Sequence, residues 1–166
     1  MNTNKKLILI VEDEPRQAEL IANYVEASGD FRTIIAHNGI EAFQALKKHR
    51  KLLGFAENEI KGIFLDIRMP DMDGMEFLQQ MRKEEKLNAY HRYIPIIMIT
   101  AYDTDEYLEQ STHPDLGMVA DYLLKPIDKI QLRDTLSKIY DCQATEFMIE
   151  NTRDQTYFMK RNRSKN

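Results

Sequence analysis

Hydrophobic residues along the chain fall into short runs separated by longer, mixed segments. Five of these runs are apolar at nearly every position, contain β-branched residues and end in turn signals: 7–11, 33–36, 62–66, 94–100 and 120–124. A strand that is apolar on both alternations is buried on both faces of its sheet. We therefore predict five buried strands at these positions.

The segments between the runs carry helical spacing and helix-start residues. Pro15 suits a first helical turn, and the apolar face expected after it comprises Leu20, Ile21, Tyr24 and Val25. Four later starts place a capping residue three positions before an acid or an amide: Asn38 before Glu41, Asp73 before Glu76, Asp103 before Glu106 and Asp128 before Gln131. Strands and helices therefore alternate along the chain.

This alternation predicts the fold class. Repeated strand–helix–strand units have right-handed crossovers and produce a parallel sheet with helices on both faces. With 166 residues, the chain is long enough for one such domain and too short for two of ordinary size. We predict a single α/β domain built on a doubly wound, five-stranded parallel sheet.

Charge and composition narrow the functional classes. A net charge of −4 and a pI near 5.6 argue against a nucleic-acid-coating protein, which normally carries a large positive excess. The N-terminal apolar run is far shorter than the roughly 20 residues of a membrane span and shorter than a signal-peptide core. Cys142 is the single cysteine, so no intramolecular disulfide or zinc pattern exists, and a cytoplasmic location is the simplest expectation.

Polar residues stand at the predicted carboxyl ends of the strands, where open parallel sheets bind ligands. These residues are Glu12, Asp13 and Glu14 after the first strand, Asp66 at the end of the third, Thr100 at the end of the fourth and Lys125 after the fifth. Crowded carboxylates repel one another unless a cation intervenes, and Mg²⁺ prefers such oxygen ligands. We expect a Mg²⁺ site suited to phosphoryl transfer, with Lys125 as a second cation and Thr100 as a hydrogen-bond donor.

Three aspartates lie within eight residues, from the end of the third apolar run onward, in the stretch "LDIRMPDMDG". Asp73 is placed to cap the helix that begins at Gly74, and Asp71 lies in a turn-forming stretch. Asp66 ends the strand that reaches the ligand-binding edge, and carboxylates can form aspartyl-phosphate intermediates. The candidate nucleophile is therefore Asp66.

Four motifs in this order, "ILIVEDEP", "FLDIRMPDMDG", "IIMITA" and "DYLLKP", resemble the receiver domain of bacterial two-component response regulators. The resemblance covers residues 5–140, and the four motifs together are specific although each alone is weak. It implies the strand order 2-1-3-4-5 of flavodoxin-like and CheY-like folds. Residues 141–166 are expected to form a C-terminal extension, as a short helix, a disordered basic tail or both.

The resemblance also implies roles for individual residues. Asp66 would be the phosphoacceptor, supplied by a histidine kinase or a phosphotransfer protein. The Mg²⁺ ligands would be Asp13, Asp66 and the backbone carbonyl of Arg68, with Glu12 assisting through a water. Thr100 and Lys125 would contact the phosphoryl oxygens, and Tyr122 would turn inward as an aromatic switch. The peptide bond before Pro126 would be cis.

Two further features bear on regulation. Arg68 and Tyr102 occupy the positions, two after the acceptor and two after the threonine, that set water access to the acyl phosphate in this family. Their bulk suggests slow dephosphorylation. The segments 47–62 and 82–93 are longer than the family usually has, and they could extend helices or form a docking surface.

The expected function is that of a single-domain response regulator without a DNA-binding domain. Phosphorylation would switch binding of an unidentified protein target through the surface of the fourth helix, the fifth strand and the fifth helix, and a homodimer is an option for this family. One alternative is a metal-dependent phosphohydrolase with an aspartyl nucleophile, although Arg68 stands where such enzymes often place a second acid.

Another alternative is a receiver-like scaffold that binds partners without phosphorylation. Single residues also have structural alternatives. Glu12 and Glu14 could favour a helix N-terminus, and Tyr122 could be a plain strand aromatic. Neither DNA nor a membrane is expected as a partner.

Overall fold

The computed structural model describes residues 5–50, 58–87, 93–101 and 119–141 of the chain. Their helices and strands are, in chain order, β1 (Lys6–Val11), α1 (Pro15–Glu26), β2 (Phe31–Ala36), α2 (Gly39–Lys48), β3 (Ile60–Asp66), α3 (Gly74–Lys86), β4 (Ile96–Thr100), β5 (Asp121–Leu124) and α5 (Lys129–Asp141). The five strands form one parallel sheet with the order β2-β1-β3-β4-β5. The predicted fold class and strand order are confirmed.

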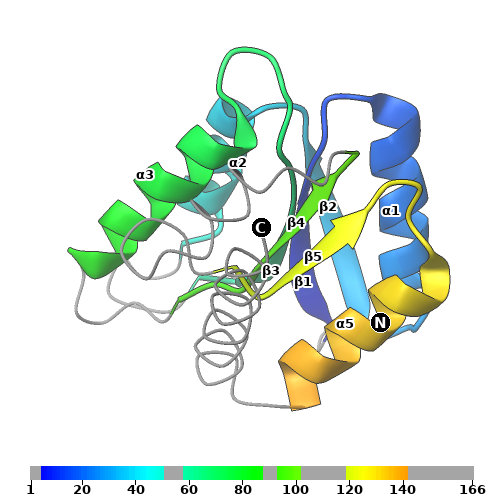
Figure 1. The fold of residues 1–166 in the computed structure, drawn as a ribbon. Helices are drawn as coiled ribbons and strands as arrows, with labels where there is room; N and C mark the ends of the chain where they lie inside the picture. The colour runs from blue at the N-terminus through cyan, green and yellow to red at the C-terminus, as the bar shows by residue number, and fades with distance from the viewer. Residues whose placement is uncertain (1–4, 51–57, 88–92, 102–118, 142–166) are drawn as a thin grey trace, which may run out of the picture.

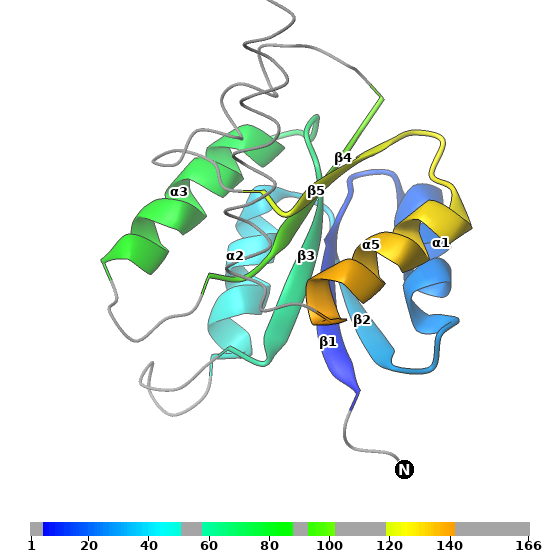
Figure 2. The same ribbon diagram turned by 60° about the horizontal axis from the view of Figure 1, so that its bottom comes forward.

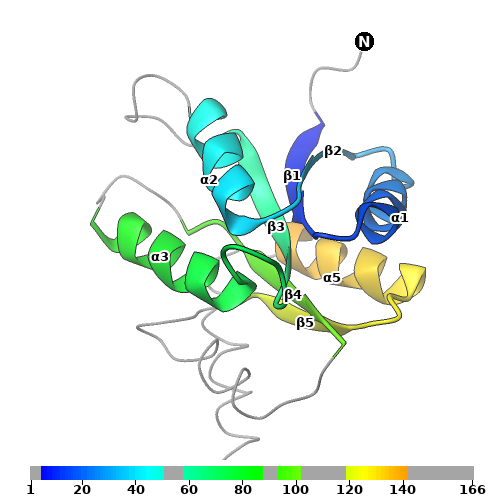
Figure 3. The ribbon, with the colours of Figure 1, turned by 90° about the horizontal axis from the view of Figure 1, so that it is seen from above.

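Helices cover both faces of the sheet. Helices α2 and α3 lie on one face, and α1 and α5 lie on the other (Figures 1 and 3). Side chains of β1 alternate between the two cores, because successive residues of a strand point to opposite faces. Leu7, Leu9 and Val11 pack on the α2 and α3 side, whereas Ile8 and Ile10 pack on the α1 and α5 side.

All five strands end at the residue where the apolar runs end, namely Val11, Ala36, Asp66, Thr100 and Leu124. The expectation that every strand is buried on both faces is wrong for the two edge strands. Ile35 in β2 is 38% exposed and Leu124 in β5 is 50% exposed. An edge strand has a neighbour on one side only, and helices cover it less completely.

Helix starts follow the capping chemistry read from the sequence. The side chains of Asn38 and Asp73 accept hydrogen bonds from the backbone N–H groups of Glu41 and Glu76. Asp128 accepts one from the N–H of Gln131 at 3.0 Å. The predicted start at Asp103 lies outside the described residues.

The predicted face of α1 needs one correction. Ile21 and Val25 are buried as expected, together with Ala18, but Leu20 is 43% exposed. Ala18, Ile21 and Val25 lie three and four positions apart and share one helix face, whereas Leu20 is turned away by about 100° from Ile21.

The first part of the long segment 82–93 extends α3, which ends at Lys86. Side chains near this end of α3 contact the residues that lead into β4. Arg82 is 1% exposed, and its Nη1 donates to Glu85 Oε2 at 2.6 Å and to the carbonyl of Ile94 at 3.0 Å. Glu85 Oε1 accepts from the N–H of Ile94 at 2.9 Å. This buried ion pair fastens the end of α3 to the entry of β4.

The other long segment, 47–62, is divided between α2, which ends at Lys48, and β3, which begins at Ile60, with an isolated bridge between Arg50 and Asn58. Among the described helices, none is long and apolar enough to cross a bilayer. The expected extension beyond Asp141 falls outside the described part of the chain.

Candidate phosphoacceptor site

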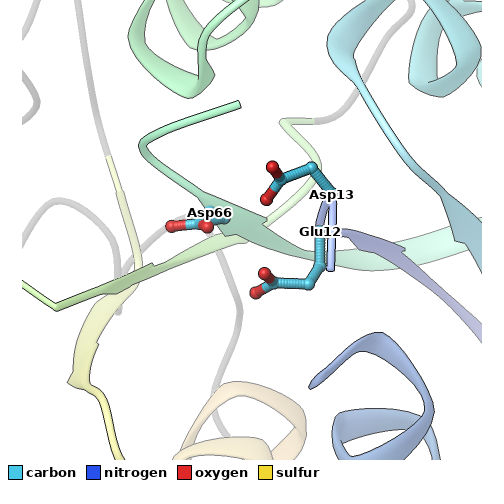
Figure 4. A group of neighbouring side chains, drawn as sticks. All are labelled: Glu12, Asp13 and Asp66. Atoms are coloured by element: carbon cyan, nitrogen blue, oxygen red, sulfur yellow. The ribbon is translucent and has the colours of Figure 1, made fainter. Parts of the chain in front are cut away.

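The site lies at the carboxyl edge of the sheet, where the ends of adjacent strands meet. Strands β1 and β3 are direct neighbours, with Val11 opposite Leu65, so the residues after Val11 come close to Asp66. The N–H of Glu12 donates to the carbonyl of Ala36 at 3.0 Å and fixes the backbone where it leaves β1. Figure 4 shows the side chains of Glu12, Asp13 and Asp66 gathered at this point.

The three carboxylates differ in exposure. Glu12 and Asp66 are buried, with 1% and 6% of their surface exposed, whereas Asp13 is exposed. One carboxylate oxygen from each of the three lies within 4.8 Å of the others. The cluster therefore has two buried acids and one acid that faces solvent.

Lys125 is the cation of the site. Its Nζ lies 2.9 Å from Asp66 Oδ2, 3.1 Å from Glu12 Oε1 and 2.8 Å from Glu12 Oε2. The N–H of Lys125 donates to the carbonyl of Thr100 at 2.8 Å, which ties the loop after β5 to the end of β4. The peptide bond from Lys125 to Pro126 is cis.

The electrostatics follow from burial and from these contacts. Burial raises the pKa of Glu12, and the neighbouring charge of Asp66 raises it further, although the hydrogen bond from Lys125 acts in the opposite direction. Burial alone would lower the pKa of Lys125, but its hydrogen bonds to Glu12 and Asp66 outweigh that effect and raise it. Lys125 is therefore a permanent cation at neutral pH.

The loop after Asp66 is shaped by backbone requirements. Asp71 has a φ of +67°, in the left-handed region that aspartate tolerates better than most residues. Asp73 caps α3, as predicted, by accepting the N–H of Glu76 at 2.8 Å. Gly74 donates to the carbonyl of Ile67 at 2.9 Å, and a Cβ at Gly74 would lie 2.1 Å from the carbonyl oxygen of Asp66.

Sequence reasoning did not single out Gly74. Its close approach to the backbone of Asp66 holds the first turn of α3 against the end of β3. The signal in the sequence is the dipeptide Asp73–Gly74 at the helix start. Glycine is unfavourable in a helix, so its presence in the first turn indicates that another part of the chain approaches closely there.

The other predicted residues surround this cluster. Thr100 is 4% exposed and ends β4, one residue beyond Ile99, which pairs with Asp66. Arg68 is exposed, two residues after Asp66. Tyr122 is half-buried against the core on the α2 and α3 side, and burial raises the pKa of its hydroxyl. Tyr102 lies outside the described residues.

The donor set fits a hard divalent cation. All of its side-chain ligands are carboxylates, and the exposed Asp13 leaves room for water molecules, which Mg²⁺ keeps in proteins. Glu12 Oε2 lies 2.8 Å from Lys125 Nζ, but within the described structure it receives no hydrogen bond of suitable geometry. A water bound to the cation would donate one.

Comparison with known proteins gives the family. The model for the "Response regulator receiver domain" matches residues 8–137. The chain is 30% identical over 134 residues to the polar-differentiation response regulator DivK of Brucella anthropi, which covers 79% of this chain and 93% of that protein. The chain belongs to the response regulator receiver domain family, whose members act in phosphorelay signalling.

Other relatives differ in length or in distance. The response regulator Rre1 of Synechocystis is 33% identical over 94 residues, which are 57% of this chain but 35% of that protein, so the match spans about a third of its length. A response regulator receiver protein from Pseudomonas putida has a similar fold, with a TM-score of 0.65, 25% identity and coverage of 81% of this chain and 97% of that one. The chemotaxis protein CheY4 of Vibrio cholerae, at 23% identity and a TM-score of 0.66, shares the fold.

Proposed function

We propose that Asp66 accepts a phosphoryl group from the phosphohistidine of a histidine kinase or a phosphotransfer protein. The observation that carries this proposal is the position of Asp66 at the end of β3, with Lys125 Nζ 2.9 Å from Oδ2 and with Glu12 and Asp13 beside it. In the transfer, an Asp66 carboxylate oxygen forms a bond to phosphorus while the bond from phosphorus to the imidazole nitrogen breaks. The histidine leaves as neutral imidazole once a proton is supplied.

The residues divide the remaining work. Asp13 and Asp66 would ligate Mg²⁺ directly, Glu12 would assist through a water, and Arg68 would contribute its backbone carbonyl. Bound Mg²⁺ supplies positive charge to the phosphoryl oxygens. Lys125 neutralises part of the negative charge of the Asp66 carboxylate before the transfer. Its ammonium group is close enough to shift from that carboxylate to an oxygen of the phosphoryl group.

The output of the reaction is a change in protein contacts. A phosphoryl group adds nearly two negative charges at pH 7, and it gives Thr100 and Lys125 a new partner. Because the backbone N–H of Lys125 donates a hydrogen bond to the carbonyl of Thr100, movement of either residue changes the surface of β5 and α5. Tyr122, half-buried on β5, would follow as the switch that alters affinity for a downstream protein.

Two other functions fit the site less well. A phosphohydrolase of this chemistry often has a second acid two residues after its nucleophile, and Arg68 occupies that place. A scaffold that never takes a phosphoryl group gives no reason for Asp13, Asp66, Thr100 and Lys125 to meet at one edge of the sheet. We therefore favour a phosphoacceptor in the cytoplasm that turns over no small substrate, with Arg68 and Tyr102 slowing the loss of phosphate.

The test is intact-protein mass after incubation with acetyl phosphate and Mg²⁺. We expect one phosphate adduct on the native chain and on Asp71→Asn, and none on Asp66→Asn, because Asp66 belongs to the acidic cluster and Asp71 does not. Asp71→Asn is a matched control from the same loop, and asparagine accepts its positive φ. An adduct that persists in Asp66→Asn would overturn the assignment, and repeated turnover of p-nitrophenyl phosphate would favour the hydrolase.

A further inference from the structure

A histidine outside the acidic cluster contacts the loop that carries two of its acids. His37 follows β2, and its Nδ1 lies 3.1 Å from the carbonyl oxygen of Glu12. Strands β1 and β2 lie side by side (Figure 2), with Val11 opposite Ala36, so the residues that follow the two strands meet at the carboxyl edge of the sheet. His37 therefore reaches the loop of Glu12 and Asp13, although 25 positions separate it from Glu12.

The chemistry of this contact determines where the ring carries its proton. A carbonyl oxygen can only accept a hydrogen bond, so Nδ1 of His37 must be the donor. A neutral imidazole has a single N–H group, and the other nitrogen is then unprotonated. The contact therefore requires the Nδ1–H tautomer of neutral His37.

Glu12 is held through both of its backbone groups. Its N–H donates to the carbonyl of Ala36 at 3.0 Å, and its carbonyl accepts from the ring of His37. The carbonyl of Glu12 and the N–H of Asp13 belong to one planar peptide unit. A hydrogen bond that orients this carbonyl therefore also sets the direction in which Asp13 begins.

Asp13 is the acid that depends most on such orientation. It is exposed, whereas Glu12 and Asp66 are buried among the residues at the ends of their strands. Mg²⁺ demands near-ideal octahedral geometry from its ligands. A ligand that must first be ordered binds the ion more weakly than one that is already in place.

His37 is itself anchored to the first turn of α2. Its backbone N–H donates to Glu41 Oε2 at 2.8 Å. The N–H of Glu41 in turn donates to Oδ1 of Asn38, the N-cap residue of α2, at 2.8 Å. A continuous set of hydrogen bonds therefore runs from the start of α2 through His37 to the peptide unit between Glu12 and Asp13.

We propose that His37 is a positioning residue of the Mg²⁺ site, whose Nδ1–H holds the Glu12 carbonyl so that Asp13 is oriented before the ion binds. The inference rests on the Mg²⁺ site of the proposed function, and His37 acts in it through the loop and not as a ligand. Groups that orient a metal ligand typically change metal affinity by about 10- to 100-fold. Because His37 is exposed and water competes for its hydrogen bond, we expect a smaller effect of about three- to tenfold.

The first test is the Mg²⁺ affinity of the unmodified full chain, measured by isothermal titration calorimetry. Asparagine carries an N–H donor at the place of Nδ1, whereas glutamine carries one at the place of Nε2. We expect His37→Gln and His37→Ala to bind Mg²⁺ about three- to tenfold more weakly than the native chain, and His37→Asn to stay within about twofold of it. The control is His49→Gln, because His49 contacts Glu59 at the other end of α2, and it should bind Mg²⁺ like the native chain.

The possible results separate the role of His37 from the existence of the site. Equal affinities in all chains would overturn the proposal, and so would equal losses in His37→Asn and His37→Gln, because the position of the donor would then not matter. A native chain that binds no Mg²⁺ would overturn the metal site of the proposed function itself. The two failures are therefore distinguishable.

The second test needs no metal. The ¹⁵N chemical shifts of the histidine rings in the metal-free chain, recorded in alkaline solution, report which nitrogen carries the proton, and the signals that disappear in His37→Gln belong to His37. We expect the Nδ1–H tautomer, which is the minor form of histidine in water. The Nε2–H tautomer at His37 would overturn the proposal, because Nδ1 would then have no proton to donate to Glu12.

Discussion

At the scale of single residues, Glu12 is the acid most affected by its surroundings. Its side chain is 1% exposed, and burial is the largest cause of its raised pKa. An ionised carboxylate in such a place costs free energy that contact with Lys125 offsets only in part. The site therefore holds a charge that is unfavourable for folding when no Mg²⁺ is bound.

This cost predicts a pH-dependent effect of Glu12→Gln. Because the folded-state pKa of Glu12 is raised above its ordinary value of 4.5, its contribution to stability is full below pH 4.5 and is lost as the pH rises through the folded-state pKa. Glutamine stays neutral throughout. In Mg²⁺-free solution, Glu12→Gln should thus gain stability relative to the native chain on going from pH 4 to pH 7.

Urea unfolding at the two pH values measures this difference. Glu19→Gln, an exposed acid on α1, is the control and should show no such change. If the native chain gained more stability than Glu12→Gln between the two pH values, the assignment of Glu12 as a costly buried charge would be wrong.

Asp13 leads to a prediction about metal binding. A ligand that binds only the folded chain stabilises it by about 2.7 kcal/mol at a concentration of 100 times its Kd. Mg²⁺ should therefore raise the thermal midpoint of the native chain, and Asp13→Asn should abolish most of that increase. Glu14→Gln removes the neighbouring acid that is not part of the cluster, and it should keep the increase. The same loss in both variants would argue against a defined site.

At the scale of elements, the start of a helix could be predicted from the sequence wherever a single capping residue determined it. The caps at Asn38, Asp73 and Asp128 were readable because one side chain satisfies a nearby N–H group. The exposure of Leu20 could not be predicted from the sequence. An apolar residue next to the buried face of a helix gives the same local sequence pattern as an apolar residue on that face. Exposure at the edge strands likewise depends on how far the helices extend.

The junction of β3 and α3 predicts different costs for two glycine substitutions. A Cβ at Gly74 would meet the carbonyl oxygen of Asp66 at 2.1 Å, whereas a Cβ at Gly39 would meet the side chain of Met72 at 2.6 Å. A flexible methionine can move aside, but the backbone of β3 cannot. Gly74→Ala should therefore cost about 3 kcal/mol or more, and Gly39→Ala about 1 kcal/mol or less.

Chemical denaturation compares the two variants, and the phosphorylation assay adds a second readout. Gly74→Ala should also slow phosphorylation by acetyl phosphate, because it displaces the backbone that carries Asp66. Similar stability for both variants would show that the end of β3 is more adaptable than its contacts indicate.

At the scale of the whole molecule, the strand order brings distant residues to one place. Asp13, Asp66, Thr100 and Lys125 were predicted to converge because parallel strands in this order share a carboxyl edge, and the structure places them there. The direct contact of Lys125 with Glu12 was not predicted. It joins side chains from elements far apart in sequence, and no local pattern encodes such a contact.

The most direct test of the central claim is to locate the phosphoryl group. Sodium borohydride reduces an acyl phosphate to an alcohol, which converts a phosphorylated aspartate to homoserine that peptide sequencing by mass spectrometry can place. After phosphorylation of the native chain by a histidine kinase or by acetyl phosphate, we predict homoserine at position 66 alone. Homoserine at position 13, 71 or 73, or phosphate retained on a residue that borohydride does not reduce, would contradict the account.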